Sequence, residues 1–171
     1  MLTEESAKKR RLAHEGIFVH VFARNCDVRR ITRPEADAFL DRYHTIGSTG
    51  GRYRYGLFIA RKDKSGLPEG TLVAVATFSS ARKWTKGDRE IRSCEWIRYA
   101  SLPDVRAIGG MGKMLQAFID EVHPDDVMSY ADTEWTDGDV YRRLGFREES
   151  RKKIEGRSDC IKFRLKLTDY A

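Results

Sequence analysis

Residues 106–113 read Arg-Ala-Ile-Gly-Gly-Met-Gly-Lys, and this stretch decides how the rest of the chain is interpreted. Glycines at three of four consecutive positions, 109–112, leave the backbone open to close approach by a ligand. Apolar residues then recur at the spacing of one helix face packed on a core, which predicts a helix directly after the turn. These positions are Met111, Met114, Leu115, Phe118, Ile119 and Val122.

A glycine turn that leads straight into a helix presents unpaired main-chain N–H groups and the positive end of the helix dipole to one point. Such a site binds phosphate groups. The same residues also suit a tight connection between a strand and a helix, with no ligand. Both interpretations stay open on this stretch alone.

Composition indicates a folded globular protein with a highly charged surface. The 171 residues suit one domain with its own core, and 40% are apolar while 34% are charged. The net charge of +6 favours polyanionic partners such as nucleic acid or nucleotide phosphates, although many moderately basic proteins have no such partner.

Targeting and redox signals point to the cytoplasm. No run approaches the roughly 18 apolar residues that cross a membrane, and the charged segment 1–11 lacks the apolar region of a secretory signal. Cys26, Cys94 and Cys160 lie far apart with no metal-ligand spacing, which predicts reduced thiols and no bound metal.

The pattern along the chain predicts a single α+β domain of antiparallel strands, a β–α–β crossover and a final hairpin. A helix starts at Thr32-Arg33-Pro34-Glu35, turns Ala38, Phe39 and Tyr43 inward, and ends before Gly47. We expect residues 1–25 to form an N-terminal helix and strand extension to a domain spanning 26–171. The further predicted elements are strands at 17–22, 26–32, 53–61, 71–79, 90–100 and 127–132, a short helix at 137–143, and a hairpin of 146–152 with 160–167.

Two motifs together carry a family resemblance. Arg106 to Met111 fits the Gln/Arg-x-x-Gly-x-Gly/Ala signature of the GCN5-related N-acetyltransferases, except that Met111 stands at the last position. Residues 141–146, Tyr-Arg-Arg-Leu-Gly-Phe, are similar to that superfamily's Tyr-x-x-Leu-Gly-Phe and follow about 30 residues later. The resemblance spans 26–167 and implies a mixed, mostly antiparallel central sheet with flanking helices.

The resemblance further implies transfer of an acyl group from acetyl-CoA, or another acyl-CoA, to a small-molecule or protein amine, by a monomer or homodimer. The diphosphate of the coenzyme would lie on main-chain amides of the glycine turn, with two flanking cations adding charge. The implied cofactor-binding residues are Arg106, Ala107, Ile108, Gly109, Gly110, Met111, Gly112 and Lys113.

Acyl transfer from a thioester needs a proton acceptor for the amine and a donor for the leaving group. Tyr141 matches the family's usual acid, and its alternative role is aromatic packing under the final hairpin. Glu95, beside Trp96, lies on the strand where such enzymes often place a base, and partial burial would raise its pKa. A salt bridge from Glu95 to Arg92 or Arg98 is the alternative.

A narrower resemblance is to the phage-associated branch that contains the Mom DNA-modification proteins, which alter the exocyclic amine of adenine. It rests on Tyr43-His44-x-x-Gly47, Glu95-x-x-Arg98-Tyr99, Gly109-Gly110-x-x-Lys113, Ser129-Tyr130-Ala131-Asp132 and Tyr141. It implies a site of Arg98, Asp132 and Tyr141, with Tyr43 and His44 close to the substrate. Asp132 could instead cap the loop 133–138, and His44 could be a helix cap.

A DNA-modifying enzyme would need a basic groove and an aromatic side chain on which a base stacks. Trp84 is available for stacking, and the basic run 81–89 around it is also typical of an exposed hairpin. A third possibility is a non-catalytic module that binds CoA or DNA. The predicted groove residues are Arg52, Arg54, Arg82, Lys83, Lys86 and Arg89.

Overall fold

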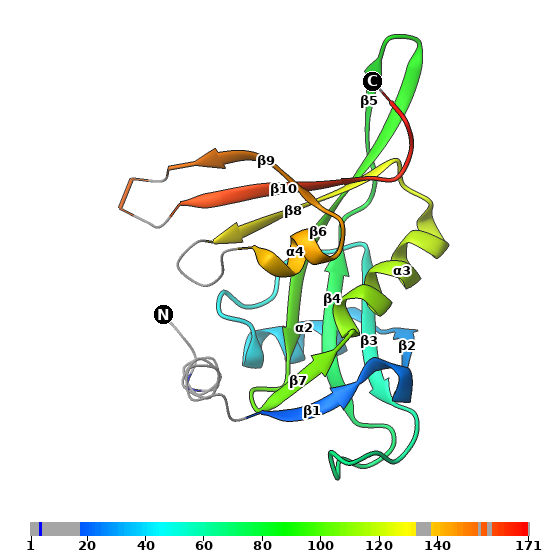
Figure 1. Cartoon of the computed structure of the whole chain (residues 1–171), viewed down its shortest axis with the longest axis vertical. Helices are drawn as coiled ribbons and strands as arrows, with labels where there is room; N and C mark the ends of the chain where they lie inside the picture. Colours follow the sequence, from blue (N-terminus) through cyan, green and yellow to red (C-terminus); the bar gives the residue numbers. More distant parts are fainter. Residues whose placement is uncertain (1–3, 5–17, 133–137, 154, 157–158, 171) are drawn as a thin grey trace. The chain divides into compact units, whose positions relative to one another are not determined.

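A computed structural model of the chain describes residue 4 and residues 18–132, 138–153, 155–156 and 159–170. Its elements, labelled in Figure 1, divide between two compact units. The first unit comprises the described residues up to Phe78 together with Arg98–Glu121, and the second comprises Ser79–Ile97 and the described residues from Val122 on. In chain order the elements are β1 (Val19–Phe22), the 3₁₀ turn η1 (Ala23–Asn25), β2 (Cys26–Arg30), α2 (Arg33–Tyr43), β3 (Tyr53–Ile59), β4 (Leu72–Phe78), β5 (Arg82–Lys86), β6 (Arg89–Ser101), β7 (Val105–Ile108), α3 (Gly110–Val122), β8 (Asp126–Asp132), α4 (Asp139–Arg143), β9 (Arg147–Lys152) and β10 (Cys160–Lys166).

The sheet of the first unit has the order β2-β3-β4, followed by the C-terminal part of β6. β3 pairs antiparallel with both β2 and β4. Val73 to Phe78 are all buried, which confirms the prediction that this apolar run is a central strand covered on both faces.

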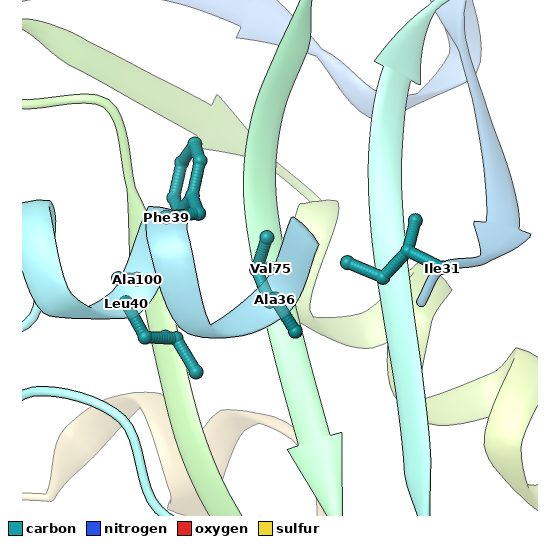
Figure 2. Packing of buried hydrophobic residues seen from close by; sticks show 6 residues of the cluster. All are labelled: Ile31, Ala36, Phe39, Leu40, Val75 and Ala100. Atoms are coloured by element: carbon teal, nitrogen blue, oxygen red, sulfur yellow. The ribbon is translucent and has the colours of Figure 1, made fainter. Parts of the chain in front are cut away.

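Helix α2 packs on this sheet as Figure 2 shows. The predicted start is confirmed, because Thr32 and Glu35 form a reciprocal capping box and Pro34 lies in the first turn. The prediction for Ala38 is wrong: this residue is exposed, and Ala36 is buried in its place. With 100° per residue, the face that carries Phe39 includes position 36 and turns position 38 outward. Ala36 and Phe39 belong to a buried hydrophobic cluster between α2 and the sheet, whose other members are Leu40, Ile31, Val75 and Ala100.

Strand β7 precedes the glycine turn and was not predicted. It pairs in parallel with β1, from Val19 opposite Val105 to Phe22 opposite Ile108. Four residues are too few for an alternating pattern to stand out, and the partner lies more than eighty positions away in the chain. Part of the predicted N-terminal extension therefore flanks the turn at 109–112.

In the second unit, β5 and β6 form a hairpin, β6 and β8 pair in parallel, and β10 pairs antiparallel with both β8 and β9. The parallel pair confirms the predicted crossover, and β9 with β10 confirms the final hairpin. All five residues of β5 are exposed, so no apolar alternation marked it as a strand. The cysteines are free thiols, as predicted, and burial raises the pKa of Cys94 to about 11.

The mixed, mostly antiparallel sheets with helices are those of the predicted α+β class. Among the described residues, none of the helices combines the length and the apolar character needed to cross a membrane.

Candidate active site

The glycine turn at the start of α3 is the first part of the candidate site, and it belongs to the first unit. Gly109 is exposed and adopts the left-handed region with φ of 78°. The first hydrogen bond of the helix runs from Lys113 N to Gly109 O, at 3.1 Å. The amides of residues 110–112 precede it and so have no acceptor within the helix. Their N–H groups are the donors that an anion at this helix end would use.

Gly110 has a structural role of its own. A Cβ at this position would lie 3.0 Å from Ala107 Cβ and 3.1 Å from Leu57 Cδ2. Contacts this short require the neighbouring side chains to shift by a few tenths of an ångström, so close packing of the helix start favours a glycine here. The tight-connection interpretation accounts for Gly110, and the left-handed turn accounts for Gly109.

The two cations predicted to flank a diphosphate have other contacts. Lys113 Nζ donates to Ala23 O at 2.9 Å and to Cys26 O at 2.5 Å, so its ammonium group fastens α3 to η1. The guanidinium of Arg106 lies over the ring of Phe18, 5.8 Å from its centre. Anion binding at this turn would therefore depend mainly on the main chain.

The turn after α2 brings together three predicted site residues of the first unit. Arg98 Nε donates to Gly47 O at 3.0 Å. His44 is the C-cap of α2, and its Nδ1 accepts from Ile46 N at 3.1 Å, as in the capping role considered for it. Tyr43 packs edge-on against Phe39 with ring centres 4.7 Å apart. Arg98 is thus placed to hold the conformation of the turn that follows Tyr43 and His44.

Tyr141, in α4 of the second unit, is the centre of an aromatic cluster. Its ring stacks on Phe163 with centres 5.3 Å apart and meets Phe146 and Trp96 edge-on at 5.5 and 6.2 Å. The phenol oxygen lies 2.9 Å from Ser129 Oγ. Burial raises the pKa of the phenol, and the hydrogen bond with Ser129 acts in the opposite direction. The aromatic packing considered for Tyr141 and a hydrogen-bonded hydroxyl therefore coexist in one side chain.

The position of Tyr141 depends on Gly138, which precedes α4. Gly138 has φ of 84°, and its carbonyl accepts from Tyr141 N at 3.0 Å. A Cβ at 138 would lie 2.6 Å from Phe163 Cε2 and would also overlap Cζ. Only glycine combines this backbone conformation with this approach to the ring.

Glu95 and Asp132 also belong to the second unit. The main chain of Glu95 is fixed by Ser79, because Glu95 N donates to Ser79 Oγ at 2.8 Å and Ser79 N donates to Glu95 O at 2.9 Å. Glu95 is half-buried. Asp132 ends β8 opposite Cys160. The loop that Asp132 was predicted to cap, apart from Gly138, lies outside the described residues.

Arg92, one predicted salt-bridge partner of Glu95, donates to the carbonyls of Val122 and His123 at 3.2 and 3.1 Å. The other partner, Arg98, donates to Gly47 as described above.

Four of the residues predicted to line a DNA groove have partners within the chain, and the other three are exposed. Trp84 Nε1 donates to Ser93 Oγ at 2.8 Å, and its ring meets Tyr170 edge-on at 5.7 Å. Arg89 contacts Asp125 at 3.0 Å. These contacts agree with the exposed-hairpin alternative. Of the remaining predicted groove residues, Lys83 pairs with Glu90, Arg54 donates to Gly51 O, and Arg52, Arg82 and Lys86 are exposed.

Sequence reasoning assigned no role to Ser129, although it lies within a quoted motif. The signal available was a hydroxyl in the middle of the buried strand 126–132, where every polar group needs a partner. The contacts of Trp96 and Phe163 with Tyr141 gave no signal, because they join separate elements.

Comparison with solved structures identifies the fold. The NatC complex bound to Gag peptide and CoA has a TM-score of 0.60 and 16% identity, covering 84% of this chain and 99% of that chain. A variant of the spermidine N-acetyltransferase from Vibrio cholerae gives 0.60 and 14%, with coverage of 84% and 94%. The ribosomal-protein-S5-alanine acetyltransferase from Vibrio fischeri gives 0.59 and 13%, with coverage of 86% and 96%. Neither a family model nor a curated protein sequence matches this chain.

The chain therefore has the fold of the GCN5-related N-acetyltransferases, as the resemblance at residues 106–111 and 141–146 predicted.

Proposed function

We propose that this protein is an acyl-CoA-dependent N-acyltransferase, with acetyl-CoA as the expected donor. The observation that carries the proposal is the left-handed Gly109 followed by three helix-start amides without intrahelical acceptors, in an acetyltransferase fold. Main-chain N–H groups at a helix N-terminus suit the diphosphate of a coenzyme and need no charged side chain.

The residues fit such a coenzyme in chemical type. The amides of Gly110, Met111 and Gly112 would hold its diphosphate, and Met111 is the one departure from the family signature. When bound, the coenzyme supplies an acyl group activated as a thioester. The proton transfers and the positioning of the acceptor depend on side chains of this chain.

The proposed chemical roles belong mainly to the second unit. Tyr141 holds a proton at Oη for the leaving group, and three aromatic rings pack against its own ring and fix its position. Glu95, a half-buried carboxylate, accepts the proton of the amine, and Asp132 assists at the end of β8. In the first unit, Arg98 positions the turn after α2, which we assign to the acceptor side together with Tyr43 and His44.

The acceptor is proposed to be an amine, either small or part of a protein. Among the similar structures, NatC is bound to a Gag peptide. The other two are acetyltransferases named for spermidine and for the alanine of ribosomal protein S5. The Mom-like modification of adenine has less support, because Arg89 and Trp84 of the predicted groove already have partners in the chain. Duplex DNA therefore enters the experiments as a comparison ligand.

Calorimetric titration of acetyl-CoA into three variants tests the coenzyme site. Gly112→Asp adds a negative charge within the first turn of α3, where it suits the helix dipole but repels a diphosphate. We expect binding to weaken by about 10-fold or more, which corresponds to about 1.4 kcal/mol. Gly112→Ala controls for the added side chain, and Gln116→Glu places the same charge at an exposed position further along α3. Equal affinity in Gly112→Asp and Gln116→Glu would refute the coenzyme site.

A second experiment tests turnover by detecting the free thiol released from acetyl-CoA. The acceptors are spermidine and peptides with free α-amino groups, compared with duplex DNA. Thiol release with an amine acceptor, and an acylated product of matching mass, is the expected result. Binding of acetyl-CoA without release to any acceptor would favour the non-catalytic module.

A further inference from the structure

Ser129 links the candidate acid to the strand beside it. It lies in β8, is 2% exposed, and belongs to the second unit together with its partners. Its Oγ lies 2.9 Å from Tyr141 Oη and 3.1 Å from Trp96 O. Both distances are those of hydrogen bonds, so one buried hydroxyl serves two oxygens at once.

The hydroxyl has a single proton, and this limits the possible arrangements. A carbonyl only accepts, so while Ser129 donates to Trp96 O, the phenol of Tyr141 must donate to Ser129 Oγ. When Ser129 instead donates to Tyr141 Oη, the phenol proton is released from this contact and points elsewhere. The two arrangements differ by a rotation of one hydroxyl and need no movement of heavy atoms.

The end of a strand ladder explains why Trp96 O is within reach of a side chain. The parallel pairing of β6 with β8 ends at Glu95 opposite Met128. Trp96 and Ser129 are the next residues on the two strands, and here a side chain takes the place of a ladder amide. The rings of Trp96 and Tyr141 also meet edge-on. Strand β6 therefore contributes both an aromatic contact to Tyr141 and the carbonyl that accepts from Ser129.

We propose that Ser129 is a positioning residue for Tyr141, and that its hydroxyl turns from Trp96 O to Tyr141 Oη when the phenol gives up its proton. The inference rests on the proposed function. The O–H bond of the phenol breaks as its proton passes to the sulfur leaving group, and the electron pair stays on Oη. Ser129 then donates a hydrogen bond to that phenolate, and the phenol later regains a proton from solvent.

Among the described residues, Ser129 is the hydrogen-bond partner of the Tyr141 phenol. The three rings that contact Tyr141 have no strong hydrogen-bond donor on their faces, and burial alone disfavours a phenolate. The elements around the phenol carry several charged side chains, among them Glu95 on β6, Asp132 on β8, Asp139, Arg142 and Arg143 on α4, and Lys162 and Arg164 on β10. The two causes that act on the pKa of Tyr141 are burial, which raises it, and the Ser129 hydrogen bond, which lowers it.

The experiment measures the phenol directly, so that it does not depend on enzyme activity. The full chain is labelled with 3-fluorotyrosine, whose phenol is more acidic than that of tyrosine, and the ¹⁹F resonance of residue 141 is assigned with Tyr141→Phe. Titration then compares the natural chain with Ser129→Ala. Ser129→Ala removes the hydrogen bond to the phenolate. Because a hydrogen bond to a charged group is lost, the titration midpoint of residue 141 should rise by about one to two pH units. Ser129→Thr keeps the hydroxyl and should restore the midpoint.

Two further measurements separate positioning from a general structural effect. In Ser129→Ala, kcat should fall at least about 10-fold while the KM for acetyl-CoA stays within about twofold, and Ser129→Thr should recover most of kcat. Ser129→Cys, a weak donor of similar size, gives an intermediate midpoint and covers the case in which Ser129→Ala does not fold.

A midpoint for residue 141 that stays within about 0.3 pH units across these variants overturns the inference. If the midpoint shifts but the chain releases no thiol with any amine, the Ser129 hydrogen bond is supported and the proposed function is refuted.

Discussion

Replacing Gly138 by alanine tests how the chain positions Tyr141. The residue has φ of 84°, a region that costs an L-residue about 1–2 kcal/mol. The new Cβ would also lie 2.6 Å from Phe163 Cε2, and overpacking of this kind costs about 1–3 kcal/mol. The two contributions lower the free energy of unfolding by about 2–5 kcal/mol together.

Urea unfolding followed by tryptophan fluorescence measures this loss, and Gly87→Ala provides a matched control. Gly87 also has a left-handed φ, 61°, but a Cβ there meets no atom within 4 Å. The control carries the backbone cost alone, so Gly138→Ala should be the less stable variant by at least about 1 kcal/mol. Equal losses in the two variants would refute the overlap with Phe163, and with it the account of how the Tyr141 ring is seated.

Three more predictions concern the second unit. Tyr141→Phe should lower kcat by about 10²-fold to 10⁴-fold while leaving acetyl-CoA affinity unchanged by calorimetry, and an unaltered kcat would exclude Tyr141 as the acid. Asp126 is fully buried and accepts from Arg164 at 2.9 Å, so Asp126→Asn should cost about 3 kcal/mol in urea unfolding, against less than about 1 kcal/mol for Glu149→Gln, which alters an exposed partner of the same arginine. The amide of Arg92 and the hydroxyl of Thr168 hold the pKa of Asp125 below its usual value, so its contribution is present at neutral pH and is lost as pH falls through the lowered pKa. Asp125→Asn should therefore reduce the difference between urea midpoints at pH 6 and pH 3, and an unchanged difference would contradict this assignment.

The elements that sequence predicted correctly are those whose burial is regular. The continuous apolar run at 72–78 and the helix face from Met114 to Phe118 report packing that repeats along the chain, and the capping residues at 32–35 act locally. Strand β7 and strand β5 were missed because one is short and the other is fully exposed.

The candidate site was predictable only where a local motif carries it. The glycine turn and Tyr141 could be found because each belongs to a run with fixed spacing. The engagement of Lys113 with η1 and of Arg98 with Gly47 depends on contacts between residues some fifty to ninety positions apart. No pattern along the sequence encodes such contacts.

Strand β6 has a consequence for how this fold can vary among related chains. One uninterrupted strand of 13 residues contributes to both compact units. Side chains alternate between the two faces of a strand, so inserting or deleting a single residue near Ile97 would exchange the faces of every residue on one side of the change. Loops tolerate changes of length, whereas under the proposed function β6 keeps a constant number of residues between Glu95 and Arg98. Homologues that retain this chemistry should therefore differ in length at their turns and never within this segment.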